Sequence, residues 1–530
     1  MMEKVKGDLP DRKQGEGSIT LFLTLVLTLI FSLCFSLLEA ARVQAFSEIA
    51  ARSLLLELES AFGEYQADLW QDYGLLFLDG GDAGGALDLT LLEGHRMEEA
   101  ALGQKEAGFF QIVLKGFEIT GFTLATDNYG AAFEKQAVAA IQAQLAAGMV
   151  EAIRGKTKKG KEIAEKSRDL EKQWESAKDA MVEAEESGQD AGMAEATGQE
   201  KGADVRASSR EGKVTEMEKS FGRGRASGSP AEDLPENPVE SVDLLKNSPT
   251  LNFVVENPSG ISGKAIMLAD RLADREKAQG NLNPPDVGSL DKLLFLQYLD
   301  GYFSCASGFA QKGGQGHALE YELEYCVAGR GSDRENLEKT VKELLLIREA
   351  GNFMTIIQDG KKQALALEIA TAAVGFTGIV PLVEAVKIGI LLAWSYIESI
   401  LDVRCLLSGG KVPLVKAVSD WKSDVSLGEE VLTEKGGESE SRENGLDYRE
   451  YLQILLMLVP EQTLVWRAMD IVERNVALKK PFFRMDSQIH GMQAEGLYTA
   501  EPLFLGFVTV GKTVDGTYHF RRNSGLTYLE

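Results

Sequence analysis

The sequence predicts a mainly helical α+β fold, in which an N-terminal transmembrane helix extends into a long soluble helix and two soluble modules are joined by a flexible linker. Three observations lead to this prediction. A single uncharged apolar run near the N-terminus is long enough to cross a bilayer. Apolar residues at helical spacing fill much of the remaining chain, and short alternating runs typical of strands occupy only a few segments.

The apolar run at residues 18–38 contains no charge, and about 20 such residues span a hydrocarbon core about 30 Å thick. Basic residues within 1–17 favour a cytoplasmic N-terminus, so that the rest of the chain lies outside the cytoplasm. A cleaved secretory signal is the alternative, but its apolar stretch would be shorter and would end at a small-residue cleavage site. We therefore expect a retained single-pass anchor in the cell membrane.

Two further features concern this helix. Neither glycine nor proline interrupts residues 18–62, and apolar residues continue at helical spacing beyond the run, which predicts one continuous helix. Within the run, hydroxyl side chains recur at every fourth residue and form a small polar stripe, which favours helix–helix contact in a membrane. The alternative is that these hydroxyls bond to carbonyls of their own helix. The stripe consists of Thr20, Thr24, Thr28, Ser32 and Ser36.

The soluble part is expected to divide by composition. Residues 39–153 form a membrane-proximal module with mixed helix and strand, and residues 154–238 connect it to an α+β module at 239–530. The connection begins as a charged helix with sparse apolar positions, an isolated helix or loose coiled-coil arm. It continues from 188 as a disordered linker rich in Gly, Ser, Glu and Ala.

Local patterns predict the elements of these modules. Residues 318–327 alternate strictly, with Glu320, Glu322 and Glu324 on one face, and give the clearest strand prediction. Residues 426–446 are expected to be a flexible acidic loop. Further strands are predicted at 250–255, 503–505, 507–510 and 518–520, and two more within 109–125 around a glycine. Helices are predicted at 131–153, 289–304, 333–350, 447–459 and 461–478.

A second hydrophobic zone covers residues 364–407. Its two uncharged stretches are each shorter than a membrane span, and Glu384 and Lys387 lie between them. We predict a pair of buried helices; a second membrane segment is the alternative.

Composition and spacing exclude several functional classes. The formal net charge of −25 argues against general nucleic-acid binding, which needs a basic face. The four cysteines form no CxxC pair and are interpreted as small hydrophobes, with a Cys305–Cys326 disulfide as the alternative. The four histidines have no metal-site spacing. We therefore assign no catalytic residue, cofactor or metal.

Two groups of acidic residues have a spacing that a site could use. The carboxylates Glu320, Glu322 and Glu324 are interpreted as a solvated strand face rather than a cation site. Glu398 and Asp402, one helical turn apart, are interpreted as an ion-paired or exposed helix face rather than a buried acid pair. The glycine-rich segment 313–316 is not a phosphate loop, because no Gly-Lys-Ser/Thr follows it.

The segment GSITLFLTLVLTLIFSLCFSLLEAAR (17–42) resembles the N-terminus of pseudopilin-like proteins of the tight-adherence (Tad/Flp) pilus, the TadE/TadG group. The chain also resembles an uncharacterised family of single-pass exported proteins of Gram-positive bacteria, through TLATDNYGAAFEKQA, LEYELEYCVAGRGSDRENL and AWSYIESILDVRCLLSGGKVPLVK. The pilin resemblance implies cleavage by a prepilin peptidase between Gly17 and Ser18, or after Gly15. The sequence departs from the pilin pattern at Phe22, where the customary residue is glutamate.

Together these features predict a membrane-anchored structural or assembly component of a cell-surface apparatus, in the manner of a Tad-type pilus. Its partners would be proteins in the membrane or on the cell surface, or further copies of the same chain. The alternatives are a membrane-anchored ectoenzyme or ligand-binding protein with an unrecognised site in 239–530, and a scaffold facing the cytoplasm.

Overall fold

A computed structural model describes residues 16–103, 109–142, 149–196, 237–255, 257–288, 291–306, 316–423, 437–504 and 516–529. The chain forms two compact units, each assembled from separated segments. Unit 1 contains residues 1–143, 272–291 and 472–530, and unit 2 contains residues 144–271 and 292–471. The predicted module at 239–530 is thus not one unit, because its last segment joins the sheet of unit 1.

Unit 1 is built around a four-stranded antiparallel sheet whose central strand, β3, pairs with every other strand. Strand β2 pairs with one edge of β3. The short β1 and then β4 pair with successive parts of the other edge. The elements of unit 1 are α1 (Glu16–Gly63), α2 (Ala67–Tyr73), β1 (Leu78–Asp79), α3 (Leu89–Gly103), β2 (Val113–Leu124), α4 (Asp127–Gln142), β3 (Gln488–Ala500) and β4 (Tyr518–Thr527).

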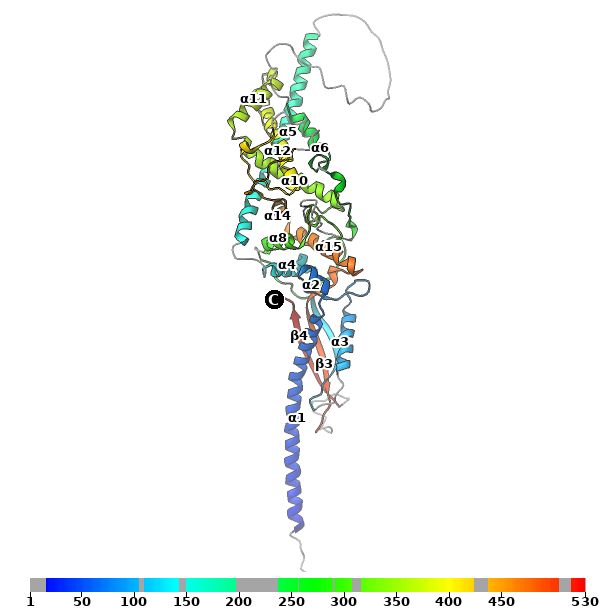
Figure 1. Ribbon diagram of the computed structural model, residues 1–530. Helices are drawn as coiled ribbons and strands as arrows, with labels where there is room; N and C mark the ends of the chain where they lie inside the picture. The colour runs from blue at the N-terminus through cyan, green and yellow to red at the C-terminus, as the bar shows by residue number, and fades with distance from the viewer. Residues whose placement is uncertain are drawn as a thin grey trace, which may run out of the picture. The chain divides into compact units, whose positions relative to one another are not determined.

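Helix α1 confirms the predicted continuous helix, and its second half lies along the sheet (Figure 1). Buried side chains recur every fourth residue on one face of this half and pack against the alternate residues of β3 that face the helix. Burying this stripe removes apolar surface from water, which stabilises the folded unit by about 25 cal/mol per Å² of that surface. The helix contributes Phe46, Ala50, Leu54 and Leu58 to the core, and β3 contributes Met492, Ala494 and Tyr498.

Strand β2 replaces the two strands predicted within 109–125. Its register against β3 shifts between Leu114 and Gly116, so the glycine marks a bulge within one strand rather than a break between two. Of the C-terminal strand predictions, 518–520 is confirmed as the start of β4. The prediction at 507–510 lies outside the described residues, as does the last residue of 503–505.

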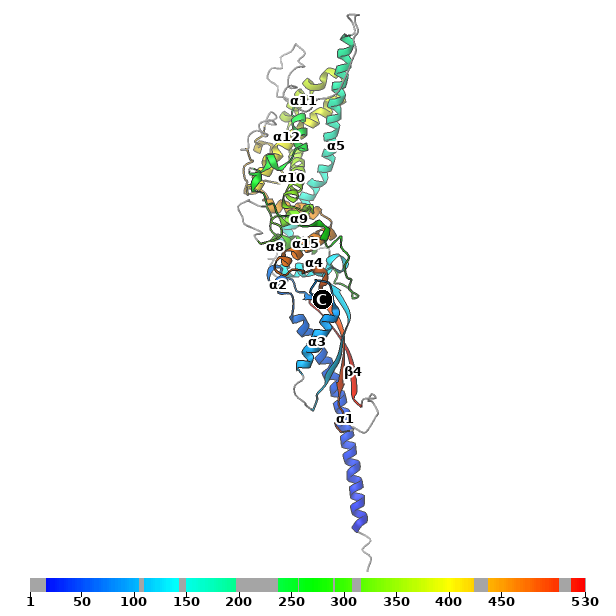
Figure 2. The ribbon, with the colours of Figure 1, turned by 90° about the vertical axis from the view of Figure 1, so that its right-hand side faces the viewer.

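Unit 2 is helical. Helix α5 runs beside α12 and α10, an arrangement visible in both ribbon views (Figure 1 and Figure 2). The helices are α5 (Met149–Ala196), α6 (Val239–Asn247), α7 (Leu251–Val254), α8 (Asp291–Tyr302), α9 (Glu322–Ala328), α10 (Asp333–Ile356), α11 (Gly360–Val374), α12 (Val380–Leu407) and α14 (Tyr448–Leu458); α15 (Glu461–Lys479) begins here and ends in unit 1.

Two predicted strands of this unit are wrong. Residues 318–327 lie in a turn followed by helix α9, and residues 250–255 contain helix α7. Alternation misled because the acidic residues at 322 and 324 are buried together with the apolar residues between and after them, so the pattern does not mark one exposed face. Gly329, which ends α9 with a φ of 63°, was the available helix signal, since glycine readily adopts this conformation.

Helix α5 is not the isolated arm or coiled coil that its charge suggested. Its buried stripe includes Trp174, Ala177 and Ala180, and a Cβ on Gly389 of α12 would lie only 2.5 Å from the Cβ of Ala177. This close approach explains how sparse small residues suffice for tight packing. Most of the predicted linker, residues 197–236, lies outside the described residues.

The hydrophobic zone at 364–407 forms the predicted pair of helices, α11 and α12, but the prediction that both are buried holds for α12 alone, because α11 buries only Ala366, Ile369, Ala370 and Val374. In the most apolar 18-residue stretch of α12, 61% of the residues are buried. Part of the predicted loop 426–446 is also packed: Ser439 is buried, and the backbone of Leu446 pairs with that of Val412. Residues 424–436 lie outside the described part of the chain.

Candidate functional site

The first half of α1 is the most exposed apolar surface described in the chain. From Ile19 to Leu38, large apolar side chains have exposed fractions between 38% and 70%, and none of the most apolar window is buried. This helix is long and apolar enough to cross a membrane. The same helix therefore presents one half to its surroundings and gives the other half to the core of unit 1.

The hydroxyl stripe lies on this exposed half. The hydroxyls of Thr24 and Thr28 donate to the carbonyls of Leu21 and Leu25, each at 2.9 Å. The Ser36 hydroxyl donates likewise to a carbonyl one turn earlier. Hydrogen bonds within the helix satisfy these donors. Contact with another helix through the stripe would therefore depend on the small volume of its side chains. The candidate processing residues Gly17 and Ser18 lie in the first turn of α1, and cleavage there stays a prediction.

A buried ion pair follows the apolar run directly. Glu39 and Arg42 are 1% and 5% exposed, and their charged groups are 2.9 Å apart. Arg42 donates to the carbonyl of Phe109, and backbone amides of Leu503 and Phe504 donate to Glu39. Burial alone would raise the pKa of Glu39, but these hydrogen bonds and the Arg42 charge hold that pKa below its ordinary value.

The Glu39–Arg42 pair thus ties two loop tips of unit 1 to the helix at the end of its apolar run. Sequence reasoning missed this role. The available signal was a glutamate and an arginine at i and i+3 immediately after an uncharged span, where a buried charge needs a partner.

Unit 1 also contains a group of possible metal ligands at the end of α1. Ligand atoms of Glu64, His95 and Glu99 all lie within 4.8 Å of one another. The Arg96 guanidinium lies 2.5 Å from Glu64 and 2.8 Å from Glu99. A cation of the chain itself is therefore already paired with both carboxylates, and the group is better explained as an ion-pair cluster.

Unit 2 holds a fully buried charge network, which includes the pair Glu398 and Asp402 considered from sequence. Asp402 accepts from Arg348 at 2.8 Å and from Lys416 at 3.0 Å, and Lys416 also binds Glu398. Two positive and two negative charges thus balance. Burial by itself raises the pKa of Asp402, but Arg348 and Lys416 outweigh it and lower the pKa to about 2. The pair is ion-paired, as expected, but completely buried.

Two of the three acidic residues of 318–327, Glu322 and Glu324, are also buried, contrary to the solvated face predicted, whereas Glu320 is partly exposed. Glu322 accepts from the backbone and hydroxyl of Ser304, and Glu324 accepts from the backbone of Ala306 and the hydroxyl of Tyr448. Burial raises the pKa of Glu324 to about 7. These carboxylates hold loop backbone in place, so the structure gives them a structural role.

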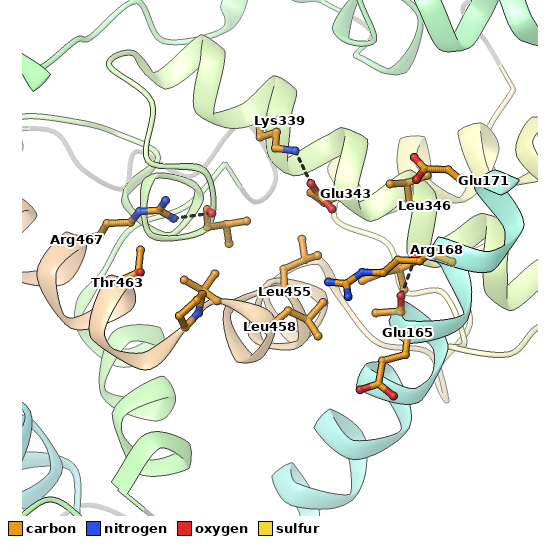
Figure 3. A pocket seen from close by; sticks show the side chains of 16 residues that line it. Glu165, Arg168, Glu171, Lys339, Glu343, Leu346, Leu455, Leu458, Thr463 and Arg467 are labelled. Atoms are coloured by element: carbon orange, nitrogen blue, oxygen red, sulfur yellow. Dashed lines mark hydrogen bonds and ion pairs between the residues drawn. The ribbon is translucent and has the colours of Figure 1, made fainter. Parts of the chain in front are cut away.

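A cavity of about 520 Å³ opens in unit 2 between α5, α10, α14 and the start of α15 (Figure 3). Its lining is mixed: leucines of α10 and α14 lie beside charged residues of α5 and α10. Lys339 pairs with Glu343 at 2.5 Å, and Arg467 donates to the carbonyls of Cys326 and Val327. Much of the charge at this cavity is thus satisfied by the chain.

The cysteines and histidines do not assemble into a site. All four cysteines lie in the described part of the chain and none of them forms a disulfide, so the alternative Cys305–Cys326 disulfide is absent, and Cys326 and Cys405 are buried as expected for small hydrophobes. The histidines lie in separate surroundings in the two units: His95 is on α3, His317 binds Glu322, His490 is buried on β3, and His519 is on β4. Residues 311–315, including most of 313–316, lie outside the described residues.

Fold and site together define a mainly helical α+β protein with one N-terminal helix able to cross a membrane. Residues 229–500 match the model of the family of unknown function DUF5702, and the chain belongs to that family. Neither the curated proteins nor the solved structures gave a match.

Proposed function

We propose that this protein is a membrane-anchored structural or assembly component of a cell-surface apparatus, of the pseudopilin kind found in tight-adherence pili. The observation that carries the proposal is the division of α1 into an exposed apolar half and a half packed on an antiparallel sheet. A rigid helix of this design anchors a soluble unit and offers its membrane half to partner helices. The resemblance of residues 17–42 to TadE/TadG-like proteins agrees with it.

The orientation gives the first test. With a C-terminal epitope tag, protease added to intact cells or protoplasts should remove the tag, because the basic N-terminus favours the cytoplasmic side. A cytoplasmic marker must survive in the same sample. A tag that stays protected until the membrane is opened would show that the soluble part faces the cytoplasm, and the cell-surface role would fail.

Assembly gives the second test. In a Cys34→Ala background, Ser32→Cys on the hydroxyl stripe should form a disulfide between copies under mild oxidation in membranes. The native Cys34 provides the matched control, because it lies about 200° around the helix from Ser32. Adding Thr24→Leu and Thr28→Leu should reduce the Ser32→Cys crosslink several-fold by blocking close approach. Contact through the stripe would be contradicted if Ser32→Cys and native Cys34 crosslinked equally and the two leucine substitutions left the crosslinking unchanged.

The alternative is a membrane-anchored ectoenzyme or ligand-binding protein, and it would use the cavity of unit 2. We rank it second because Lys339, Glu343 and Arg467 at the cavity are already paired within the chain. A ligand would have to displace these contacts, which lowers the net gain from binding.

A further inference from the structure

Two loop tips of unit 1 expose aromatic and aliphatic side chains beside the end of the apolar run of α1. The tip before β2 carries Phe109 and Phe110, which are 47% and 49% exposed. The tip after β3 carries Leu503, which is 55% exposed, and the half-buried Phe504. Soluble surfaces seldom gather several such side chains, so a patch of this kind marks an interaction site.

The two tips form one cluster with the helix. The ring of Phe504 stacks on Phe35 of α1 with centroids 5.2 Å apart and an interplanar angle of 6°. Phe109 lies 6.2 Å from Phe504 and 4.9 Å from Phe110. The Arg42 guanidinium lies over the ring of Phe109 at 4.9 Å. The cluster is thus held at a definite level on the helix.

The position of the cluster along α1 indicates what covers it. Phe35 belongs to the uncharged run that ends at Leu38, so its ring lies about 5 Å inside the end of the run, at 1.5 Å per residue. A bilayer that surrounds the run to its end therefore also reaches Phe504, which is in contact with Phe35. Aromatic side chains at this depth suit the boundary between headgroups and acyl chains.

We propose that Phe109, Phe110, Leu503 and Phe504 form a second membrane contact, inserted into the outer headgroup–acyl boundary beside α1. The buried Glu39–Arg42 pair positions this contact by holding the backbone of both tips. The contact seats the sheet of unit 1 directly on the bilayer and fixes the tilt of that unit, which one helix alone would leave free to vary. The inference rests on the membrane anchoring proposed above.

Depth measurements on the full chain in phosphatidylcholine–phosphatidylglycerol vesicles test it. Single nitroxide labels are placed at Phe110→Cys and Leu503→Cys, with Cys34 and Cys305 replaced, and power saturation compares collisions with oxygen and with a nickel chelate. Native Cys34, inside the apolar run, reports the anchor. Phe482→Cys, at a position 69% exposed in unit 1 and near the opposite end of β3, reports water exposure.

We expect labels at 110 and 503 to collide several-fold more with oxygen relative to nickel than the label at 482. If both match the label at 482 while Cys34 remains lipid-exposed, the second contact is refuted and the anchor stands. If Cys34 is itself accessible to nickel, the anchor fails as well. Protection of 110 and 503 from both reagents would mean that protein covers the tips, and this also overturns the lipid contact.

Discussion

Replacing Arg348 with methionine should destabilise unit 2 by about 3–5 kcal/mol. Arg348 is completely buried on α10 and binds Asp402 of α12 together with the carbonyls of Pro413 and Leu414. Methionine fills similar space but leaves the buried network with one unbalanced negative charge. Removing one partner of a buried pair is costly because the remaining charge has lost its water and gained no substitute.

Native-state hydrogen exchange of the full chain in detergent can measure this loss at the amides of α10 and α12. Lys339→Met is the matched control on the same helix. Lys339 is exposed and pairs with Glu343, so its loss should cost no more than about 0.5 kcal/mol. Adding Asp402→Asn to Arg348→Met restores charge balance and should recover part of the stability. Equal effects of Arg348→Met and Lys339→Met would show that the network contributes little.

The Leu54→Ala variant should destabilise unit 1 by about 2–5 kcal/mol. Leu54 is completely buried on α1, and it packs so closely on β3 that a Cβ at Gly496 would lie 3.2 Å from its Cδ1. Truncation leaves a cavity between a rigid helix and a paired strand, neither of which can collapse to fill it. Exchange should therefore accelerate at the amides of β3 and β4.

Leu56→Ala is the control, since Leu56 is two residues away on the same helix and 63% exposed. Its effect should stay within about 0.5 kcal/mol. Neither substitution changes the apolar run at 18–38, so both proteins should remain in the membrane fraction. If Leu54→Ala were as mild as Leu56→Ala, the second half of α1 would not be part of the core of unit 1.

Local patterns predicted several elements well. Helix α1 followed from the absence of glycine and proline and from its apolar periodicity, and the helix predicted from residue 333 begins at that residue as α10. There, Ser332 accepts from the backbone amide of Glu335 and its hydroxyl contacts the Glu335 carboxylate. These features depend on residues within a few turns of one another, which the sequence displays directly.

Pairings over long distances in the chain could not be predicted in this way. Tyr498 of β3 pairs with Leu114 of β2, so a segment near the C-terminus completes a sheet that begins near the N-terminus. Alternation in a single segment carries no information about which distant strand will be its partner. This is why 239–530 was predicted as one module, whereas the structure assigns its last part to unit 1.

The sequence by itself determined that an uncharged apolar run of membrane length lies near the N-terminus, that its helix continues without interruption beyond the run, and that the remainder is mainly helical. Only the tertiary structure decided which charged residues are buried. Glu324 looks like a surface residue because the donors that permit its burial belong to Ala306 and Tyr448, the latter 124 positions away. Whether a carboxylate is exposed depends on such partners, which are brought together by folding.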